Sequence, residues 1–382
     1  MKKTLALGLA IAWSFIFVSC DNDNHQHHKN HDGDHSSEQS SGHGKTIADT
    51  TVHYAQEKHL ANITQLTNAG DNAEAYFSFD NSMIVFQGKV PAWGSECDQI
   101  YYFPFTDGDM ITEMPKLLSK DMGRTTCSYF MPGDTSVLYA STRSGDIACP
   151  PDPQKREDGK YVWPIYPDFD IYVANLKGDV IDTLVYGPGY DAEATVSAQG
   201  DKIVFTSDRS GDLELYTCDI DGSNVKQITS GVGYDGGAFF SPDGSQLVFR
   251  SSRPQTEADI KEYKDLLKQG LVMPTNMEIY TCNVDGSNLQ QVTHLGKANW
   301  APFFHPSGKK IIFSSNHAGA KGYEFNLYMI NTDGSGLERI TYDGVFDAFP
   351  MFSYDGKKLV FASNRNNGGT HNTNLFIADW VD

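Results

Sequence analysis

The sequence predicts an all-β fold: a six-bladed β-propeller that is closed by an N-terminal strand and carries a short helical insertion in its fourth blade. The main observation is a recurring motif in which a strand ends, a tight turn follows and a second strand begins, as in Phe240-Ser-Pro-Asp-Gly leading to Leu247-Val-Phe249. Proline suits the second turn position and glycine the position that needs a positive φ, which is typical of a β-hairpin. Six copies, spaced 53, 66, 44, 64 and 48 residues apart, begin at Phe77, Phe130, Val196, Phe240, Phe304 and Phe352. Such periods indicate one four-stranded blade per repeat.

The first twenty residues are typical of an export signal. A positively charged start precedes an apolar run from Leu5 to Val18, and Cys20 follows a serine. This ending resembles a bacterial lipoprotein signal, in which Cys20 would be lipidated and become the mature N-terminus; the alternative is an ordinary secretory signal with an incidental cysteine. Several acyl chains hold a protein stably on a membrane. We therefore expect an exported lipoprotein, periplasmic or anchored at the outer membrane or cell surface.

Residues 21–57 are predicted to form a disordered tether before the propeller domain, residues 58–382. From Asp21 to Thr51 the segment is polar and has no apolar period. Imidazoles in such a tract can bind a divalent metal such as Zn²⁺, so a weakly held metal is the one cofactor that the sequence suggests. A solvated linker is the alternative. The candidate ligands are His25, His27, His28, His31 and His35, with His43 nearby.

The stretch Ile63–Thr67 predicts how the ring closes. It matches the blade-ending stretches at 222–229, 286–293 and 334–341, which follow Asp-Gly turns. The last repeat stops at a third strand, Asn374–Trp380, with no fourth strand after it. We expect the N-terminal strand to complete the sixth blade, because an open edge would leave backbone groups unpaired.

The order of a Ser-Pro-Asp-Gly turn, a Glu-Leu-Tyr strand and an Asp-Gly-Ser-Asn turn resembles the repeat of the periplasmic TolB propeller family, over residues 58–382. The resemblance implies a six-bladed propeller. TolB carries an α/β domain before its propeller, and the tether occupies that place here. The chain thus looks like a lipoprotein that lacks this domain. Propellers fused to serine peptidases are also similar, but no hydrolase domain is expected here.

One face of the propeller is predicted to carry the site. Loops that enter first strands share this face with loops that join second to third strands, including both long insertions, whereas the other face has only tight turns. Polar residues near the starts of the first strands are expected at the mouth of the central channel, and we call them the mouth ring: Asn72, Thr125, Asp191, Asp235, Asn299 and Asp347. A second set follows the second strands: Arg143, Arg209, Arg253, His317 and Arg365. These side chains either hold a ligand or cation, or the arginines pair with carboxylates between blades and brace the loops.

The two insertions supply further candidates. Residues 146–168 are rich in proline and place Tyr161, Trp163 and Tyr166 on the rim, where exposed aromatics favour binding of peptides or sugars. Residues 255–276 predict a short helix that Thr256 caps and Gly270 ends. This helix either packs on the propeller or acts as a lid.

The cysteines after Cys20 fall into two groups. Cys218 and Cys282 occupy equivalent third-strand positions and are expected to be buried thiols. Cys97, Cys127 and Cys149 map near the insertion face, and one disulfide is expected among them, although the sequence does not choose the pair.

Composition and motifs restrict the classes of function that the protein can have. The formal net charge of −19 argues against nucleic acid as a partner. No recognised catalytic motif occurs, although Glu74 and Glu193 occupy equivalent first-strand positions and could form an acid–base pair if they are not structural. The sequence thus favours an envelope lipoprotein that binds or scaffolds a protein, peptide or glycan partner. A propeller hydrolase or lyase that acts on glycans or peptides is the alternative.

Overall fold

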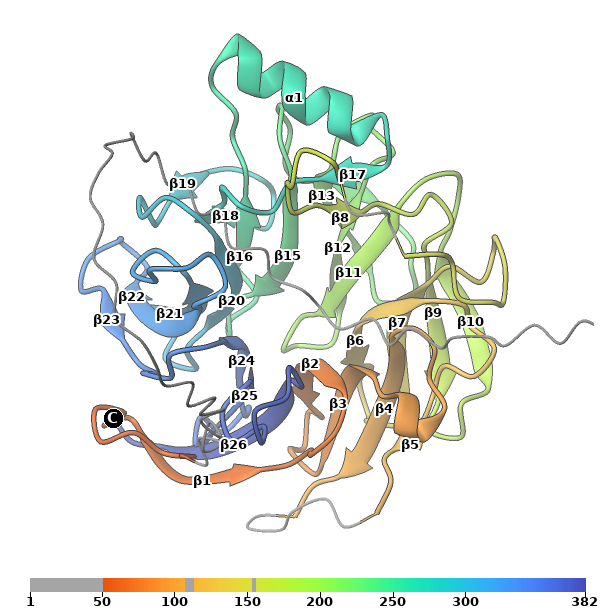
Figure 1. The fold of residues 1–382 in the computed structure, drawn as a ribbon. Helices are drawn as coiled ribbons and strands as arrows, with labels where there is room; N and C mark the ends of the chain where they lie inside the picture. The colour runs from red at the N-terminus through yellow and green to blue at the C-terminus, as the bar shows by residue number, and fades with distance from the viewer. Residues whose placement is uncertain (1–50, 107–112, 153–155) are drawn as a thin grey trace, which may run out of the picture.

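The computed structural model describes residues 51–106, 113–152 and 156–382, which form six four-stranded antiparallel blades around a central axis (Figure 1). The predicted six-bladed propeller is therefore confirmed. The innermost strands are β2 (Asp71–Phe77), β6 (Thr125–Phe130), β11 (Asp191–Val196), β15 (Asp235–Phe240), β20 (Asn299–Phe304) and β24 (Asp347–Phe352). The second strands are β3 (Met83–Lys89), β7 (Ser136–Ser141), β12 (Lys202–Ser207), β16 (Gln246–Ser251), β21 (Lys310–Ser315) and β25 (Lys358–Ser363).

The outer half of each blade consists of a third strand and a fourth strand that is no longer than the third. The third strands are β4 (Gln99–Pro104), β9 (Asp170–Asn175), β13 (Glu214–Asp219), β18 (Glu278–Asn283), β22 (Asn326–Asn331) and β26 (Asn374–Trp380). The fourth strands are β5 (Lys116–Leu117), β10 (Val180–Val185), β14 (Lys226–Gln227), β19 (Gln290–Gln291), β23 (Glu338–Arg339) and β1 (Leu60–Gln65). Blades one to six are numbered from β2 onward, so β1 belongs to blade six.

The Ser-Pro-Asp-Gly turn folds as its residue types dictate. The Asp243 carboxylate accepts hydrogen bonds from the Ser241 hydroxyl at 2.6 Å and from the Ser245 N–H at 3.0 Å, and Gly244 has a φ of +74°. These bonds satisfy backbone and side-chain donors inside the turn. The turn then returns the chain into β16, where Phe249 is fully buried.

The N-terminal strand closes the ring as predicted. β1 pairs with β26 in the antiparallel sense, with Leu60 opposite Trp380 and Gln65 opposite Phe376. The packed part of the chain begins before the predicted boundary at residue 58, because the Glu57 carboxylate is buried against Arg365 of blade six. The N-terminal end of the described chain is thus fixed to the propeller by an ion pair as well as by a strand.

Every innermost strand contains a β-bulge, shown by a register shift against its neighbour. A bulge adds a residue to one strand and re-aims its side chain. One residue of each bulge has a positive φ, and we call these six residues the axial layer: Glu74, Cys127, Glu193, Gly237, Ala301 and Phe349.

Aromatic side chains fill the axis beyond this layer. Tyr76 of blade one lies with its ring centroid 5.6 Å from that of Phe239 of blade four, although these blades are opposite in the ring. Phe239 also contacts Tyr129 at 6.3 Å and Phe303 at 5.1 Å. The central axis is therefore packed with apolar rings on the side of the tight turns.

The two insertions meet above blade three. β8 (Trp163–Pro164) from blade two pairs with β17 (Leu271–Val272) from blade four, and Figure 1 shows this small sheet beneath α1 (Glu257–Leu267). The predicted helix is capped by Thr256, whose hydroxyl accepts the Asp259 N–H. A 3₁₀ turn (Pro91–Trp93) is the other helical element described. In the described residues, no helix has the length and apolar character needed to span a membrane.

Candidate functional site

The mouth ring lies at the first strands as expected, but it is buried. Asn72, Thr125, Asp235, Asn299 and Asp347 have no exposed surface, and Asp191 is 4% exposed. Side chains enclosed to this extent need partners within the protein.

The three carboxylates of the mouth ring each bind an arginine of their own blade. Arg209 Nη2 lies 2.7 Å from Asp191 Oδ1, and Arg253 Nη2 lies 2.5 Å from Asp235 Oδ2. The arginine follows the second strand, which pairs with the first, so the hairpin itself brings the two charges together. The bracing pairs therefore lie within blades, not between blades as the structural alternative expected.

Blade six extends the pattern with a third group. The Arg365 guanidinium contacts Asp347 at 3.1 Å and Glu57 at 3.0 Å, and all three side chains are fully buried. Arg365 also lies over the ring of Tyr54, which donates a hydrogen bond to Asp343. Burial raises the pKa of Asp343 to about 6. This cluster fastens the N-terminal segment to the insertion face.

The other blades replace the charged pair by neutral contacts. The Ser315 hydroxyl donates to Asn299 Oδ1 at 2.7 Å and lies 2.9 Å from His317 Nδ1. Arg143 has no carboxylate at the mouth ring, since Thr125 occupies that position, and it donates to the backbone carbonyl of Asp121. These residues hold loops in place.

The three predicted rim aromatics differ in exposure. Tyr161 is 41% exposed and accepts a hydrogen bond from Trp163 Nε1 at 3.1 Å. Trp163 is partly buried, packing against Trp300 at 5.1 Å between ring centroids. Tyr166 donates to the carbonyl of Pro151 at 3.2 Å. Only Tyr161 offers a large open surface to a partner.

The helix packs on the propeller through Tyr263 and Leu266, which are buried. The Tyr263 hydroxyl donates a hydrogen bond to Asp212 of blade three, and Glu262 forms an ion pair with Lys160 of the other insertion. Together with the β8–β17 pairing, these contacts make the two insertions one connected unit.

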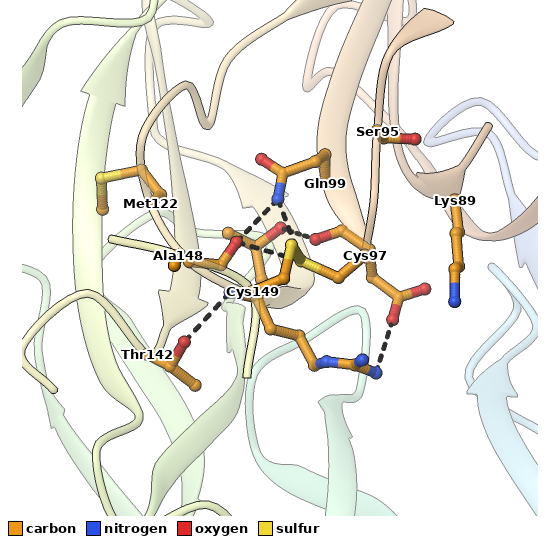
Figure 2. The surroundings of a disulfide bond; sticks show 12 residues. Lys89, Ser95, Cys97, Gln99, Met122, Thr142, Ala148 and Cys149 are labelled. Atoms are coloured by element: carbon orange, nitrogen blue, oxygen red, sulfur yellow. Dashed lines mark hydrogen bonds and ion pairs between the residues drawn. A yellow bond between two sulfur atoms is a disulfide. The ribbon is translucent and has the colours of Figure 1, made fainter. Parts of the chain in front are cut away.

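A disulfide joins this unit to blade one. Cys97, in the loop between β3 and β4, is bonded to Cys149 of the blade-two insertion, as Figure 2 shows. Beside it, Gln99 Nε2 donates to the Gly123 carbonyl at 2.7 Å. Cys218 and Cys282 are buried free thiols, and Cys127 is a free thiol with partial exposure.

A second polar group lies in the axial layer, which the sequence prediction considered only through Glu74 and Glu193. Arg250 Nη2 forms an ion pair with the Glu193 carboxylate, which also accepts hydrogen bonds from Tyr234 at 2.7 Å, Thr206 at 2.7 Å and the Gly237 N–H at 2.9 Å. A carboxylate with this many donors is a poor general base. The proposed acid–base pair is therefore poorly supported on the Glu193 side.

Glycine at position 237 makes room for this arrangement. A Cβ there would lie 2.1 Å from Arg250 Nη1, and the φ of Gly237 is +60°. The Arg250 guanidinium also lies 5.2 Å from the ring centroid of Trp163 and 5.4 Å from that of Tyr234. Its charge is thus shared between one carboxylate and two aromatic faces.

Glu74 is the least satisfied member of the axial layer. Its Oε2 atom is buried and has no hydrogen-bond partner among the described residues. Burial raises the pKa of Glu74, and the charges of Glu193 and Asp98 raise it further, whereas a hydrogen bond with the Cys127 thiol and the charge of Arg250 lower it. Glu74 is in blade one and Arg250 is in blade four, on the opposite side of the ring. Since the charge of Arg250 acts on the pKa of Glu74, both side chains lie near the axis.

Glu74 and Cys127 are enclosed by the ring yet keep part of their surface accessible. Burial raises the pKa of the Cys127 thiol well above its ordinary value. Part of each side chain is therefore in contact with solvent, although most of its surroundings are protein. We call Glu74, Cys127, Glu193, Tyr234 and Arg250 the axial site.

The remaining predicted residues lie outside the described chain: Cys20 and the tether histidines His25, His27, His28, His31 and His35. Among residues 51–106, 113–152 and 156–382, no group of three or more His, Cys, Asp or Glu side chains has a metal-binding arrangement. The axial site had one overlooked sequence signal, namely an arginine at position 250, directly after the apolar run Leu247–Phe249 of the same strand.

Comparisons with known proteins give a consistent result. The family described as TolB beta propeller domain matches residues 166–271 and 272–371. A solved structure described as TolB from Agrobacterium tumefaciens is similar with a TM-score of 0.52 and 17% identity, covering 84% of this chain and 97% of that chain. TolB from Acinetobacter baumannii has a TM-score of 0.48 and 17% identity, covering 81% of this chain and 63% of that chain.

An oligogalacturonate lyase from Vibrio parahaemolyticus also matches, with a TM-score of 0.46 and 13% identity, covering 83% of this chain and 93% of that chain. No curated protein matches the chain in sequence. At these identities the structural likeness shows the propeller fold alone.

Proposed function

Because the chain belongs to the TolB beta propeller domain family, we propose that it is an exported lipoprotein whose propeller binds a protein, peptide or glycan partner through the insertion face. In this proposal Cys20 carries the lipid anchor and the tether holds the propeller away from the membrane. The propeller is a rigid binding module, with no reaction assigned to it.

The observation that carries the proposal is the unequal construction of the two faces. One face has tight turns such as that at Asp243, whereas the other carries two insertions that pair through β8 and β17 and are tied to blade one by the Cys97–Cys149 disulfide. A rigid surface loses little entropy when it binds. The exposed ring of Tyr161 adds apolar area at low rotamer cost.

The proposal is tested by photo-crosslinking in the envelope of the producing cell. p-Benzoylphenylalanine replaces Tyr161 in one variant and Leu289, on the tight-turn face, in the matched control; these positions are 41% and 47% exposed. We expect a discrete adduct from position 161 and none from position 289. Equal adducts at both positions, or an adduct only at position 289, would contradict the proposed face.

The anchor is tested in the same cells. Cys20→Ala should move the protein from the membrane fraction to the soluble fraction. A Cys20→Ala protein that stays in the membrane with unchanged detergent partitioning shows that the lipoprotein assignment is wrong, whatever the crosslinking result.

A further inference from the structure

We propose that the axial site binds a single organic ammonium group, which pairs with the Glu74 carboxylate. This site differs from the rim surface at Tyr161 and does not depend on the proposed function. The axial site holds two carboxyl groups, those of Glu74 and Glu193, but one guanidinium, that of Arg250.

The guanidinium is already committed. Arg250 forms an ion pair with Glu193 and donates to the Tyr234 hydroxyl at 2.7 Å, with the ring of Trp163 on its face. The Arg250 Nε atom has no hydrogen-bond partner among the described residues, but the charge of the guanidinium is already paired with Glu193. Releasing Arg250 for an anionic ligand would leave the Glu193 carboxylate buried without its counter-ion, which is costly.

The Glu74 carboxyl has no such commitment. Its Oε2 atom is unpartnered within the described chain, and the thiol of Cys127 is a weak donor. A neutral carboxylic acid avoids the cost of burial, but a cation brought to the same place would stabilise the carboxylate. The site thus lacks one positive charge.

The surroundings favour an organic cation. The Tyr234 hydroxyl donates to the Glu193 carboxylate at 2.7 Å, and burial, together with the charges of Glu74 and Glu193, raises the pKa values of Tyr76 and Tyr190. Aromatic faces attract ammonium groups, and the attraction grows when water is excluded. The aromatic contact between Tyr76 and Phe239 occupies the axis on the tight-turn side, so the ligand would enter from the insertion face.

The bulge at Glu74 places this residue in the axial layer. Its φ is +52°, a conformation that costs energy for any residue other than glycine. Cys127 and Glu193 share this conformation, with φ of +47° and +58°. The bulge positions of the first three blades thus carry polar side chains, whereas blades four to six have Gly237, Ala301 and Phe349 there.

Binding of the ammonium group should be coupled to the release of a proton. The groups that face Glu74 are Cys127, Glu193 and Asp98, which carry no positive charge, and Arg250, which carries one. Burial raises the pKa of Glu74 and a bound ammonium group would lower it, so binding should release a proton and affinity should increase as pH rises, while a primary amine with a pKa near that of lysine, about 10, stays charged.

The probes are n-butylamine, n-butanol and butyrate, which share a carbon chain and differ in charge. Titration calorimetry of the full propeller should show millimolar binding of butylamine, with at least tenfold weaker binding of the other two. Repeating the titration in buffers of different ionisation enthalpy measures the proton release, which we expect to accompany amine binding and to decrease as pH rises.

Glu74→Gln should lower butylamine affinity at least tenfold and abolish the proton release. Glu278→Gln is the matched control, since Glu278 is a partly buried glutamate whose oxygens accept from Thr293 at 2.6 Å and the Gly296 N–H at 2.6 Å, away from the axial site. Unchanged affinity in Glu74→Gln, or equal affinity for butanol and butylamine, would overturn the proposal. Thermal denaturation confirms that both variants are folded.

Discussion

The mouth ring and the axial layer are two sets of residues on the same six innermost strands, two positions apart, yet their chemistry differs. At the mouth ring, Asp191 and Asp235 are paired with arginines within their own blades. In the axial layer, Glu193 is paired with Arg250, whereas Glu74 has no ion-pair partner among the described residues and, like Asp235 of the mouth ring, has one buried oxygen without a hydrogen bond. The repeated charges thus stabilise the blades, whereas Glu74 lacks a counter-ion of its own, which is the basis of the proposed ammonium site.

The largest expected effect tests the mouth ring at Arg365. Arg365→Met should lower the free energy of unfolding by about 3–5 kcal/mol, because it leaves the buried carboxylates of Glu57 and Asp347 without their cation. Arg143→Met, at the equivalent position without a carboxylate partner, is the control and should cost less than about 1 kcal/mol. Urea denaturation measures both. Equal losses would mean that the pairing does not brace the ring.

A smaller effect is expected in the dependence of the free energy of unfolding on pH. Burial raises the pKa of Glu214 to about 7 from its ordinary value of 4.5. The folded protein therefore holds this proton more tightly than the unfolded chain, so the stability contribution is complete below pH 4.5, falls as pH rises, and is lost above pH 7. The loss approaches about 3 kcal/mol, at about 1.4 kcal/mol per pH unit.

Glu214→Gln should flatten this part of the stability profile between pH 5 and 7, as followed by denaturant titration at each pH. The charge of Asp235 contributes to the raised pKa of Glu214, so Asp235→Asn should also reduce the slope. If the pH dependence of stability is unchanged in both variants, Glu214 does not cause it and the charge of Asp235 does not act on Glu214.

The smallest expected effect tests the axial layer. Glu74→Gln should change the free energy of unfolding by less than about 1 kcal/mol, or increase it, because the substitution replaces a carboxyl group that has one buried, unsatisfied oxygen. Thermal denaturation at pH 8 and pH 5 measures this. A loss as large as that of Arg365→Met would show that Glu74 is structural, and the contrast between the two sets of residues would disappear.

The fold was predictable because its evidence is local. The turn at Asp243 and Gly244 depends on neighbouring residues alone. Ile63–Thr67 can be recognised as a fourth strand because its short motif repeats that of the other fourth strands. The helix after Thr256 likewise follows from its capping residues.

The site was only partly predictable. The sequence identified the mouth ring positions, but their pairing within blades depends on strand register, which places Asp191 opposite Ser207 and thus near Arg209. The axial layer depends on a bulge in each innermost strand. Its members, among them glutamate, cysteine and phenylalanine, share a backbone conformation and no side-chain chemistry, so no pattern of residue types reveals them.

The pairing of β8 with β17 has a consequence for how the ring unfolds. It joins blades two and four across blade three, whereas the pairing of β1 with β26 closes blade six, on the opposite side of the ring. Leu60 pairs with Trp380 from the far end of the chain, and such long-range contacts form late during folding. Partial opening should therefore start at the blade-six seam, and native-state hydrogen exchange should be faster for amides of β1 than for those of β12 within blade three.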